Sequence, residues 1–270
     1  MYLAIDVGGT KTLFAVFSKS GEKLSDQRIP TPKLYEDFIK SAENIIKNEL
    51  AQYTFSACCC ALPGRLDREK GIGIRFGNLT WQKVPVRDDL NNLLGDIPVY
   101  IENDAKLGGL SEALLVHEWY KKVLYLTIGT GLGGSFIVNG VLEKEFLDME
   151  PGNMMIEYDG KLQGWEDVVS GHAIKLRYGK KASEISDDKI WKEYVKGLAL
   201  GINELSANFT PDVIIIGGGV GAHFEKFQTF LEEELKKINN PIVPLPTLLK
   251  ARRPEEAVIY GCYQYIKQQA

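Results

Sequence analysis

The chain has 270 residues, of which 44% are hydrophobic, so it is long enough to bury a substantial core. A net charge of -4 offers no broad attraction to the phosphates of nucleic acids, so nucleic-acid partners are disfavoured. The chain lacks a run of about 20 apolar residues, and its first residues lack the basic flank of a signal peptide, so we expect a cytoplasmic protein without a membrane partner.

The first part of the chain predicts a sheet covered by a helix. Strands are expected over 2–6 and 12–17, joined by a glycine turn, and a third short strand follows a second turn. Apolar side chains at helical spacing predict one helix over 35–53. Buried strands are expected over 54–61 and 99–101. Both end in polar or glycine-containing loops, where open α/β sheets usually bind ligands.

Three of the cysteines are adjacent, at Cys58, Cys59 and Cys60, and the fourth is Cys262. Neighbouring side chains in a strand point to opposite faces, so the adjacent three cannot form a metal-ligand cluster. We therefore expect reduced thiols that pack in the core as small hydrophobic groups.

The pattern of the first part restarts further along the chain. After an expected helix over 105–117, strands over 123–128 and 135–138 enclose a second glycine turn. Asp6 and Thr127 therefore begin equivalent segments of a duplicated hairpin, offset by 121 residues (127 − 6). The duplication predicts two related α/β domains that face each other across a cleft.

The remaining elements complete the second domain and return the chain to the first. Helices are expected over 190–208 and 224–238, with a buried strand over 213–216 between them. The expected parts are a small N-terminal α/β domain (1–107), a larger α/β domain (108–253) and a C-terminal helix (254–270) that packs back on the first domain.

Two glycine turns can hold phosphates, because missing side chains let backbone N–H groups approach the anion and a hydroxyl adds a donor. They are Gly8, Gly9 and Thr10 in the first hairpin and Gly129, Thr130 and Gly131 in the second. Either turn alone would be an ordinary hairpin, but two at matching positions of a duplicated unit favour phosphate binding. The chain has no G-x-x-x-x-G-K-[ST] motif, and the first turn does not open a helix, so neither a P-loop nor a dinucleotide fingerprint is predicted.

A third glycine segment consists of Gly217, Gly218 and Gly219, between a predicted strand and a predicted helix. Without side chains it would let a nucleotide base or ribose lie against the backbone. A tight strand-to-helix turn is the other interpretation of this segment.

Asp104 is the candidate for acid–base chemistry. It follows Asn103 at the end of a predicted strand, and Ala105 begins a helix, so its position also suits a helix N-cap. Phosphoryl transfer needs a carboxylate that orients and deprotonates the attacking hydroxyl, while donors and Mg²⁺ neutralise the charge on the moving group. Asp104 meets that need, and we predict it to be the general base.

The histidines are His117, His172 and His223. Histidine is a common metal ligand and proton carrier, but none of the three has metal-ligand spacing with an acidic or thiol partner. We expect them at the surface or in caps and assign them no role.

Together these segments resemble the ROK family of sugar kinases, repressors and open reading frames. The resemblance runs from Ile5 to about Gly261 and rests on six short motifs in order. It implies two related actin-like ATPase (ribonuclease H-like) domains around a central cleft. The motifs are Asp6-Val-Gly-Gly-Thr-Lys11, Leu62-Pro63-Gly64, Asn78-Leu-Thr-Trp81, Glu102-Asn103-Asp104-Ala105, Thr127-Ile-Gly-Thr-Gly-Leu-Gly-Gly134 and Ile215-Ile-Gly-Gly-Gly219.

The resemblance also implies roles for single residues. Asn103 and Asp104 would hold the acceptor hydroxyl, Gly64 would lie in the sugar-side loop, and Asn78 would bind a ring hydroxyl. Asp6 would help to position a Mg²⁺ ion through water. The implied nucleotide-binding residues are Asp6, Gly8, Gly9, Thr10, Lys11, Thr127, Gly129, Thr130, Gly131, Gly217, Gly218 and Gly219.

One signature of the family is only partly kept. In the family, this signature consists of Gly-Glu-x-Gly-His, then a cysteine-rich zinc loop, then a Glu four residues before Ser-Gly. In this chain Glu150 and Glu166 match the two glutamates, Asn153 replaces the histidine, and the cysteines of the loop are absent. We therefore expect no zinc site, with the region held by packing around Trp165. Both carboxylates suit sugar hydroxyls, and Asn153 still offers a donor and an acceptor. The alternative for the glutamates is two solvated carboxylates in a polar loop.

The resemblance implies an ATP-dependent hexose kinase that phosphorylates the 6-hydroxyl of glucose. Open alternatives are a kinase for N-acetylmannosamine, N-acetylglucosamine, fructose or mannose, and a polyphosphate-dependent glucokinase. The alternative from another class is a non-catalytic sugar-binding regulator. Repressors of the family carry a helix-turn-helix module ahead of the sugar domain, whereas here Asp6 follows Met1 by only five residues, so this alternative is disfavoured. We expect sugar and nucleotide as partners, Mg²⁺ as cofactor and, as relatives suggest, a homodimer.

Overall fold

The structure is a computed structural model that describes residues 1–253 and 255–269. The chain forms two compact units: unit 1 is Met1–Ser111 with the segment from Glu256 on, and unit 2 is Glu112–Glu255. The predicted boundary after residue 107 and the division after Ser111 both fall within helix α3 (Asp104–Ala113). Pro254 and Ala270, the two ends of the predicted last helix, lie outside the described residues. Within the described residues, no helix is long and apolar enough to cross a membrane.

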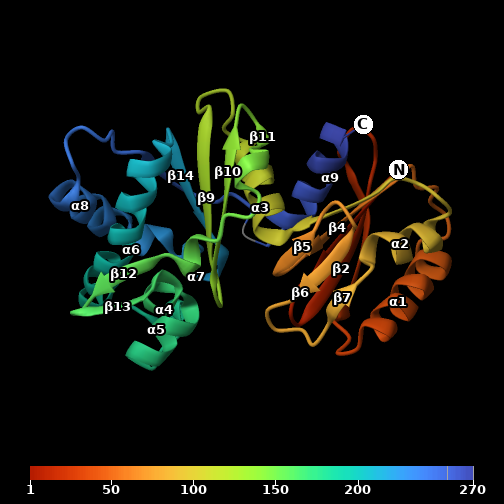
Figure 1. Ribbon diagram of the computed structural model, residues 1–270, viewed down its shortest axis with the longest axis horizontal. Coiled ribbons are helices and arrows are strands. Elements are labelled where there is room, and N and C mark those ends of the chain that lie inside the picture. The colour runs from red at the N-terminus through yellow and green to blue at the C-terminus, as the bar shows by residue number, and fades with distance from the viewer. Residues whose placement is uncertain (254, 270) are drawn as a thin grey trace. The chain divides into compact units, whose positions relative to one another are not determined.

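Unit 1 is built on a five-stranded sheet with the order β3-β2-β1-β4-β8 (Figure 1). The strands are β1 (Tyr2–Val7), β2 (Lys11–Phe17), β3 (Lys23–Pro30), β4 (Ala57–Leu62) and β8 (Val99–Asn103). The first three form the predicted antiparallel meander, whereas β4 runs parallel to β1 and β8 parallel to β4. The C-terminal ends of β1, β4 and β8 therefore lie at one edge of the sheet.

Helices cover both faces of this sheet. They are α1 (Tyr35–Asn44), α2 (Val86–Leu94), α3 (Asp104–Ala113) and α9 (Ala257–Gln269). On one face, Leu3 of β1 belongs to the same core cluster as Phe38 of α1 and Leu90 of α2. On the other face, Ala4 belongs to a cluster with Ile259 of α9. The alternating apolar side chains of β1 thus join two helical layers to one sheet.

The cysteines follow the same alternation. Cys58 and Cys60 lie in the cluster under α1 and α2, whereas Cys59 and Cys262 lie in the cluster under α9. All four are buried and free. Burial raises the pKa of the Cys58, Cys59 and Cys60 thiols, which keeps them protonated. The prediction of reduced, core-packed thiols is confirmed.

Several elements of unit 1 differ from the sequence prediction. The predicted helix over 35–53 is shorter, because α1 ends at Asn44 and a π-helical turn (Ile45–Glu49) follows. The Leu50 amide closes that turn on the Ile45 carbonyl at 2.9 Å. A small sheet of β5 (Arg65–Asp67), β6 (Ile72–Arg75) and β7 (Gln82–Val84) was not predicted, because strands this short carry little periodic signal.

Unit 2 repeats the topology of unit 1. Its sheet has the order β11-β10-β9-β14-β15. The strands are β9 (Lys122–Ile128), β10 (Leu132–Val138), β11 (Val141–Leu142), β14 (Val213–Gly217) and β15 (Thr247–Lys250). Here too an antiparallel meander is followed by two strands that run parallel to its first strand. The prediction of a duplicated α/β unit is confirmed by this matching order.

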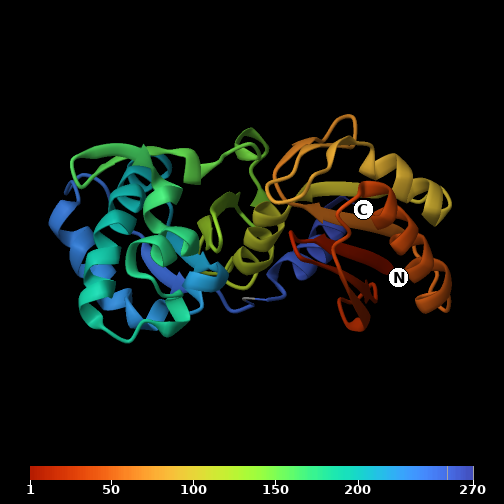
Figure 2. The same cartoon turned by 90° about the horizontal axis from the view of Figure 1, so that it is seen from below.

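A second layer of unit 2 consists of helices and one hairpin. They are β12 (Met155–Tyr158), β13 (Lys161–Gly164), α4 (Trp165–Val169), α5 (Gly171–Tyr178), α6 (Asp188–Phe209), α7 (Gly218–Gly221) and α8 (Gln228–Ile238). Helices α6 and α8 lie side by side in both views (Figures 1 and 2). Trp165 is fully buried and donates its indole N–H to the Gly197 carbonyl of α6 at 3.0 Å. Packing around Trp165 therefore anchors the region after Asn153, as predicted.

Candidate active site

Charged side chains gather at the edge of unit 1 where its parallel strands end. Asp6 of β1 lies in register with Ala61 of β4, and Ala61 lies in register with Glu102 of β8. Asn103 is the last residue of β8, and Asp104 is the first of α3. The structure therefore brings Asp6, Asn103 and Asp104, which the sequence singled out, to the same edge of one sheet.

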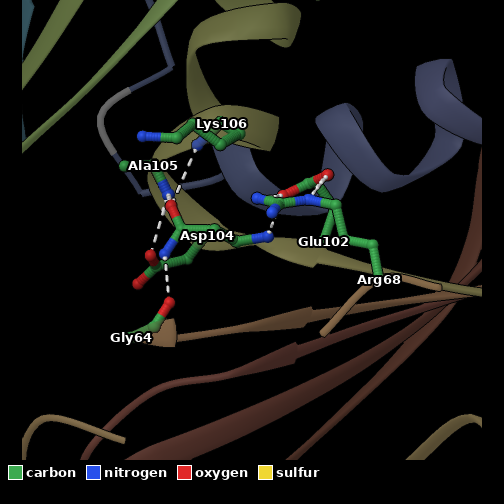
Figure 3. Close-up of polar contacts among 7 residues, drawn as sticks. Gly64, Arg68, Glu102, Asp104, Ala105 and Lys106 are labelled. Carbon is green, nitrogen blue, oxygen red and sulfur yellow. Dashed lines mark hydrogen bonds and ion pairs between the residues drawn. The ribbon is translucent and has the colours of Figure 1, made fainter. Parts of the chain in front are cut away.

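Asn103 is the N-cap of α3. Its side-chain oxygen accepts hydrogen bonds from the amides of Ala105, at 3.0 Å, and Lys106, at 3.3 Å. Its Nδ2 atom donates to the Gly64 carbonyl at 3.1 Å (Figure 3). The predicted sugar contact at Asn103 thus has a structural task as well, because one side chain joins the sugar-side loop to the start of α3.

Asp104 occupies the first helical position, one residue after the cap. Its Oδ1 atom accepts the Ala105 amide at 2.8 Å, and its side chain is half-buried. An acidic group at this end of a helix interacts favourably with the helix dipole. The N-cap that the sequence offered as an alternative for Asp104 is supplied by Asn103.

Asp6 is electrostatically coupled to Asp104. The pKa of Asp6 is raised to about 7, because burial and the nearby Asp104 carboxylate both raise it, burial more strongly, while Arg28 opposes both. The two carboxylates are therefore close enough for their charges to interact, and a pair of carboxylates stabilises a divalent cation. Across the described residues, no group of three or more His, Cys, Asp or Glu side chains is placed to hold a metal directly.

The first glycine turn is closed by its own backbone and by Thr31, the residue after β3. The Gly8 amide donates to the Lys11 carbonyl at 2.9 Å, and the Thr31 hydroxyl donates to the Gly8 carbonyl at 2.7 Å. Gly9, Thr10 and Lys11 are exposed. A methyl group on Gly9 would lie 3.3 Å from the Asn78 side chain. The predicted phosphate loop and the predicted ring-hydroxyl contact are thus direct neighbours.

Two further segments of unit 1 position predicted sugar contacts. Gly64 has a φ of +91°, and a Cβ there would collide with the Arg75 carbonyl, so only glycine fits. Asn78 is exposed, whereas Trp81, three residues on, is buried. Trp81 donates its indole N–H to the Lys33 carbonyl at 3.1 Å and so anchors the segment that presents Asn78.

The second glycine turn, in unit 2, rests on Glu166. The Gly129 amide donates to the Gly131 carbonyl at 2.9 Å, which closes the turn. The Leu132 amide donates to Oε2 of Glu166 at 2.6 Å, and a Cβ on Gly131 would collide with the same oxygen. Thr127 is half-buried on β9 beside the turn. Glu166, predicted as a sugar contact, therefore also supports the backbone of the turn.

The remaining predicted sugar contacts lie next to Glu166. Glu150 and Asn153 are exposed at the two ends of a short 3-10 turn over Pro151–Asn153, where the Asn153 amide donates to the Glu150 carbonyl at 3.1 Å. A methyl group on Gly152 would lie 3.3 Å from Cβ of Glu166. The structure thus places the segment from Glu150 to Asn153 beside Glu166, in accord with the predicted pair of carboxylates.

A cavity of about 520 Å³ opens beside the second glycine turn. Gly219 of the triple-glycine segment lines it, while Gly218, with a φ of +79°, packs against Ile128. The segment therefore makes a strand-to-helix turn and also borders a cavity, and its contact with a nucleotide stays a prediction. The lining residues are Gly129, Thr130, Gly171, His172, Lys175, Lys181, Ala182, Ser183, Gly219, Val220 and His223.

Sequence reasoning missed the basic side of this cavity. His172 and Lys175 come from the first turns of α5, Lys181 from the loop after it, and His223 from the loop after α7. Burial, with Lys226 and Lys250 nearby, lowers the pKa of His223. One signal was present, because Ser170 before Gly171 is a strong helix N-cap, and its hydroxyl accepts the Ala173 amide at 3.2 Å.

Comparison with known proteins agrees with the duplicated sheets and the glycine turns. The chain has a TM-score of 0.81 with a ROK family glucokinase of Streptomyces griseus solved with glucose and AMPPNP, at 21% identity over 99% of each chain. This likeness shows the fold, that of the actin-like ATPase sugar kinases, and confirms the predicted fold class. The ROK family matches residues 2–269, and the chain therefore belongs to the ROK family.

Two further relatives indicate the chemistry of the family. An N-acetyl-D-glucosamine kinase of Haemophilus influenzae is 26% identical over 298 residues, which cover 97% of each chain. An inorganic polyphosphate/ATP-glucomannokinase of Arthrobacter sp. strain KM has a TM-score of 0.73 and 26% identity, over 100% of this chain and 99% of that one. The predicted enzyme class, a phosphotransferase with an alcohol group as acceptor, is confirmed.

Proposed function

We propose that this protein is a hexose kinase that transfers the γ-phosphoryl group of ATP to the 6-hydroxyl of a sugar, with Asp104 as general base. The observation that carries the proposal is the carboxylate edge of unit 1. Asp104 begins α3 beside an Asn103 cap that reaches the Gly64 loop, and the pKa of Asp6 responds to its charge. A carboxylate fixed beside a glycine turn is what phosphoryl transfer to an alcohol requires.

The proposed reaction moves one proton and one phosphoryl group. Asp104 accepts the proton of the sugar hydroxyl as the hydroxyl oxygen forms a bond to the γ-phosphorus, and the bond from that phosphorus to the β-phosphate oxygen breaks. Asn103 and Asn78 orient the sugar, and the loop at Gly64 borders it. The two unit 1 segments that present Asn78 and Gly64 are fixed by the Trp81 anchor and the Asn103 bond.

Mg²⁺ fits the proposed site at Asp6. A second carboxylate contributes to the raised pKa of Asp6, and this supports a cation at the same place. Asp6 would hold the ion through water, and the ion would neutralise charge on the phosphates. Gly9 and Thr10 are exposed and would offer the backbone donors of the first glycine turn, and the Lys11 side chain adds a positive charge.

Unit 2 supplies the proposed donor site and the rest of the sugar contacts. The second glycine turn, with Thr127 and Thr130, would bind phosphates, and the 520 Å³ cavity beside it would take the base and ribose. Glu150, Asn153 and Glu166 would accept and donate hydrogen bonds to ring hydroxyls. Glucose is the first sugar to test, and N-acetylglucosamine, N-acetylmannosamine, mannose and fructose follow.

A second phosphoryl donor is supported by the basic lining of the cavity. Lys175 and Lys181 add two positive charges to a wall that also carries His172 and His223. Such a wall suits a longer polyanion as well as a nucleotide. Inorganic polyphosphate is therefore the alternative donor.

The test is a screen of the five sugars with ATP and Mg²⁺, in which ADP release is coupled to a dye, and a repeat with polyphosphate in which sugar phosphate is measured. We expect one sugar to exceed the others in kcat/KM, and the Asp104→Asn variant to be inactive with it. Sugar binding by calorimetry without phosphate transfer from either donor would instead identify a sugar-sensing regulator. Mass measurement in solution tests the expected homodimer.

A further inference from the structure

We propose that Arg68 is a positioning residue for Asp104, an inference that rests on the proposed function. Arg68 lies in the turn between β5 and β6 of the small sheet in unit 1. Its guanidinium reaches Glu102, the residue before Asn103 (Figure 3). A chain of direct contacts therefore runs from the β5–β6 turn to the start of α3.

The contact with Glu102 is a bidentate ion pair. Nε of Arg68 donates to Oε2 of Glu102 at 2.7 Å, and Nη2 donates to Oε1 at 2.7 Å. The Glu102 side chain is fully buried, and the Arg68 side chain is 24% exposed. The planar fork of arginine fixes both the distance and the orientation of a carboxylate, which a lysine cannot do.

The same carboxylate holds the backbone of the catalytic segment. Oε1 of Glu102 accepts the Asn103 amide at 2.6 Å. The Asn103 side chain in turn caps α3 and bonds to the Gly64 carbonyl. Asp104 therefore lies between a backbone amide that is held by Glu102 and a first helical turn that is held by Asn103. The direction of the Asp104 side chain depends on both of these contacts.

The turn that carries Arg68 is itself fixed. Oδ1 of Asp67 accepts the Lys70 amide at 3.0 Å inside the turn. Arg87 of α2 donates to the Glu69 carbonyl at 3.0 Å, and its own amide donates to the Gly71 carbonyl at 3.1 Å. Arg68 is therefore presented by a braced turn rather than by a free loop.

A buried ion pair of this kind adds little net stability, because the desolvation of both charges offsets their attraction. Its geometric effect remains, since it links two segments of unit 1 that are 34 residues apart in the chain. Small displacements of a base relative to its substrate lower turnover without weakening substrate binding. The pair is therefore expected to act on kcat.

The first test is Arg68→Lys, which keeps the charge and loses the fork. We expect kcat to fall by about tenfold, with KM for sugar and for ATP within about twofold of the parent enzyme. The matched control is Lys70→Gln in the same turn, because the Lys70 side chain is 71% exposed and its pair with Asp67 is a surface pair. The control should keep the parent kcat. A parent-like kcat in Arg68→Lys, or a change confined to KM for the sugar, overturns the inference.

The second test separates positioning from folding. Arg68→Met alone leaves a buried carboxylate without its partner and lowers stability, so it is combined with Glu102→Gln, which removes the charge and keeps an acceptor for the Asn103 amide. We expect the double variant to unfold at a denaturant concentration close to that of the parent, while kcat stays at least about tenfold lower. Parent-like turnover in the double variant overturns the inference. Asp104→Asn is measured alongside the Arg68 variants. If Asp104→Asn keeps turnover, the proposed base is refuted. If Asp104→Asn is inactive while the Arg68 variants behave like the parent, only the role of Arg68 is refuted.

Discussion

The two sheets have the same strand order, yet the ends of their parallel strands are chemically different. In unit 1, Asp6 is the last residue but one of β1, Asn103 is the last residue of β8, and Asp104 follows Asn103 directly. In unit 2, β9 and β14 lead into the glycine segments at 129–131 and 217–219. Both copies of the fold therefore carry a glycine turn after their first strand, but unit 1 adds the carboxylates of Asp6 and Asp104 at this edge, and unit 2 adds the glycine segment at 217–219.

Under the proposed function, this difference would give the two sheets different parts of one reaction. Carboxylates suit the acceptor side, where a proton is removed, and bare backbone amides suit the donor side, where anionic phosphates bind. Even the carboxylate that unit 2 does use near its turn, Glu166, accepts a backbone amide at 2.6 Å. The strand order is shared, and the loop residues decide the chemistry.

The largest expected effect comes from neutralising the carboxylate edge at Asp104. Asp104→Asn keeps the shape of the side chain and removes the base, so kcat should fall by about 10²-fold or more. Sugar binding, measured by calorimetry, should change little. A variant that turns over at the parent rate would show that the base lies elsewhere.

A substitution at Asp6 tests the carboxylate edge by its effect on the free energy of unfolding. The folded pKa of Asp6, about 7, lies above the usual value near 4, so the folded state binds the proton more tightly and stability falls as pH rises between these two values. Asp6→Asn removes this loss, and should raise the free energy of unfolding by about 2 kcal/mol at pH 8 without Mg²⁺, with little change at pH 4. Denaturant unfolding at both pH values measures this.

The control for Asp6 is Asp37→Asn, because the Asp37 side chain is 53% exposed and its pair with Lys40 is at the surface. The effect of that substitution should not depend on pH in this range. An Asp6→Asn effect that is equal at pH 4 and pH 8 would contradict the raised pKa.

The backbone edge of unit 2 is tested at Gly131. An alanine there would displace the Glu166 carboxylate from the Leu132 amide, so we expect KM for the nucleotide to rise by about tenfold. Glu166→Gln keeps an acceptor for that amide and should change this KM much less. Steady-state kinetics with varied ATP compares the two, and equal effects would argue against support of the turn by Glu166.

The smallest expected effect is at the basic wall of the cavity. Lys181→Gln removes one exposed charge, so KM for ATP should rise by about threefold at low salt and by less at high salt. Lys180→Gln is the matched control, because Lys180 is the neighbouring lysine in the chain but is not among the residues that line the cavity. With polyphosphate as donor the effect of Lys181→Gln should be larger, since more charge is bound.

Local patterns in the sequence predicted the architecture and much of the candidate site. The strand–glycine–strand repeat revealed the duplication, and the polar residues at the end of a buried strand singled out Asp104, because strand ends are encoded locally. The role expected for Asp6 came from the family resemblance. The strands of the small sheet were missed because they are too short for a period to show.

The parts that could not be predicted depend on contacts between distant segments. The partner of Glu166 is the amide of Leu132, 34 residues away, and no local pattern encodes that bond. The basic cavity wall combines His172 and Lys175 with Lys181 and His223 from separate loops, so its charges converge only after folding. The Arg68–Glu102 pair is another such contact, since nothing near Arg68 in the sequence specifies a buried carboxylate.

Helix α9 closes unit 1 from the far end of the chain. Gly261 lets its backbone touch that of α3 at Leu107, where any Cβ would collide, and Ile259 packs in one cluster with Ala4. During synthesis all of unit 2 leaves the ribosome before this helix does. The domain that starts first is thus completed last, and the emerging polypeptide carries an open apolar surface on its first sheet until α9, which ends at Gln269, has been synthesised.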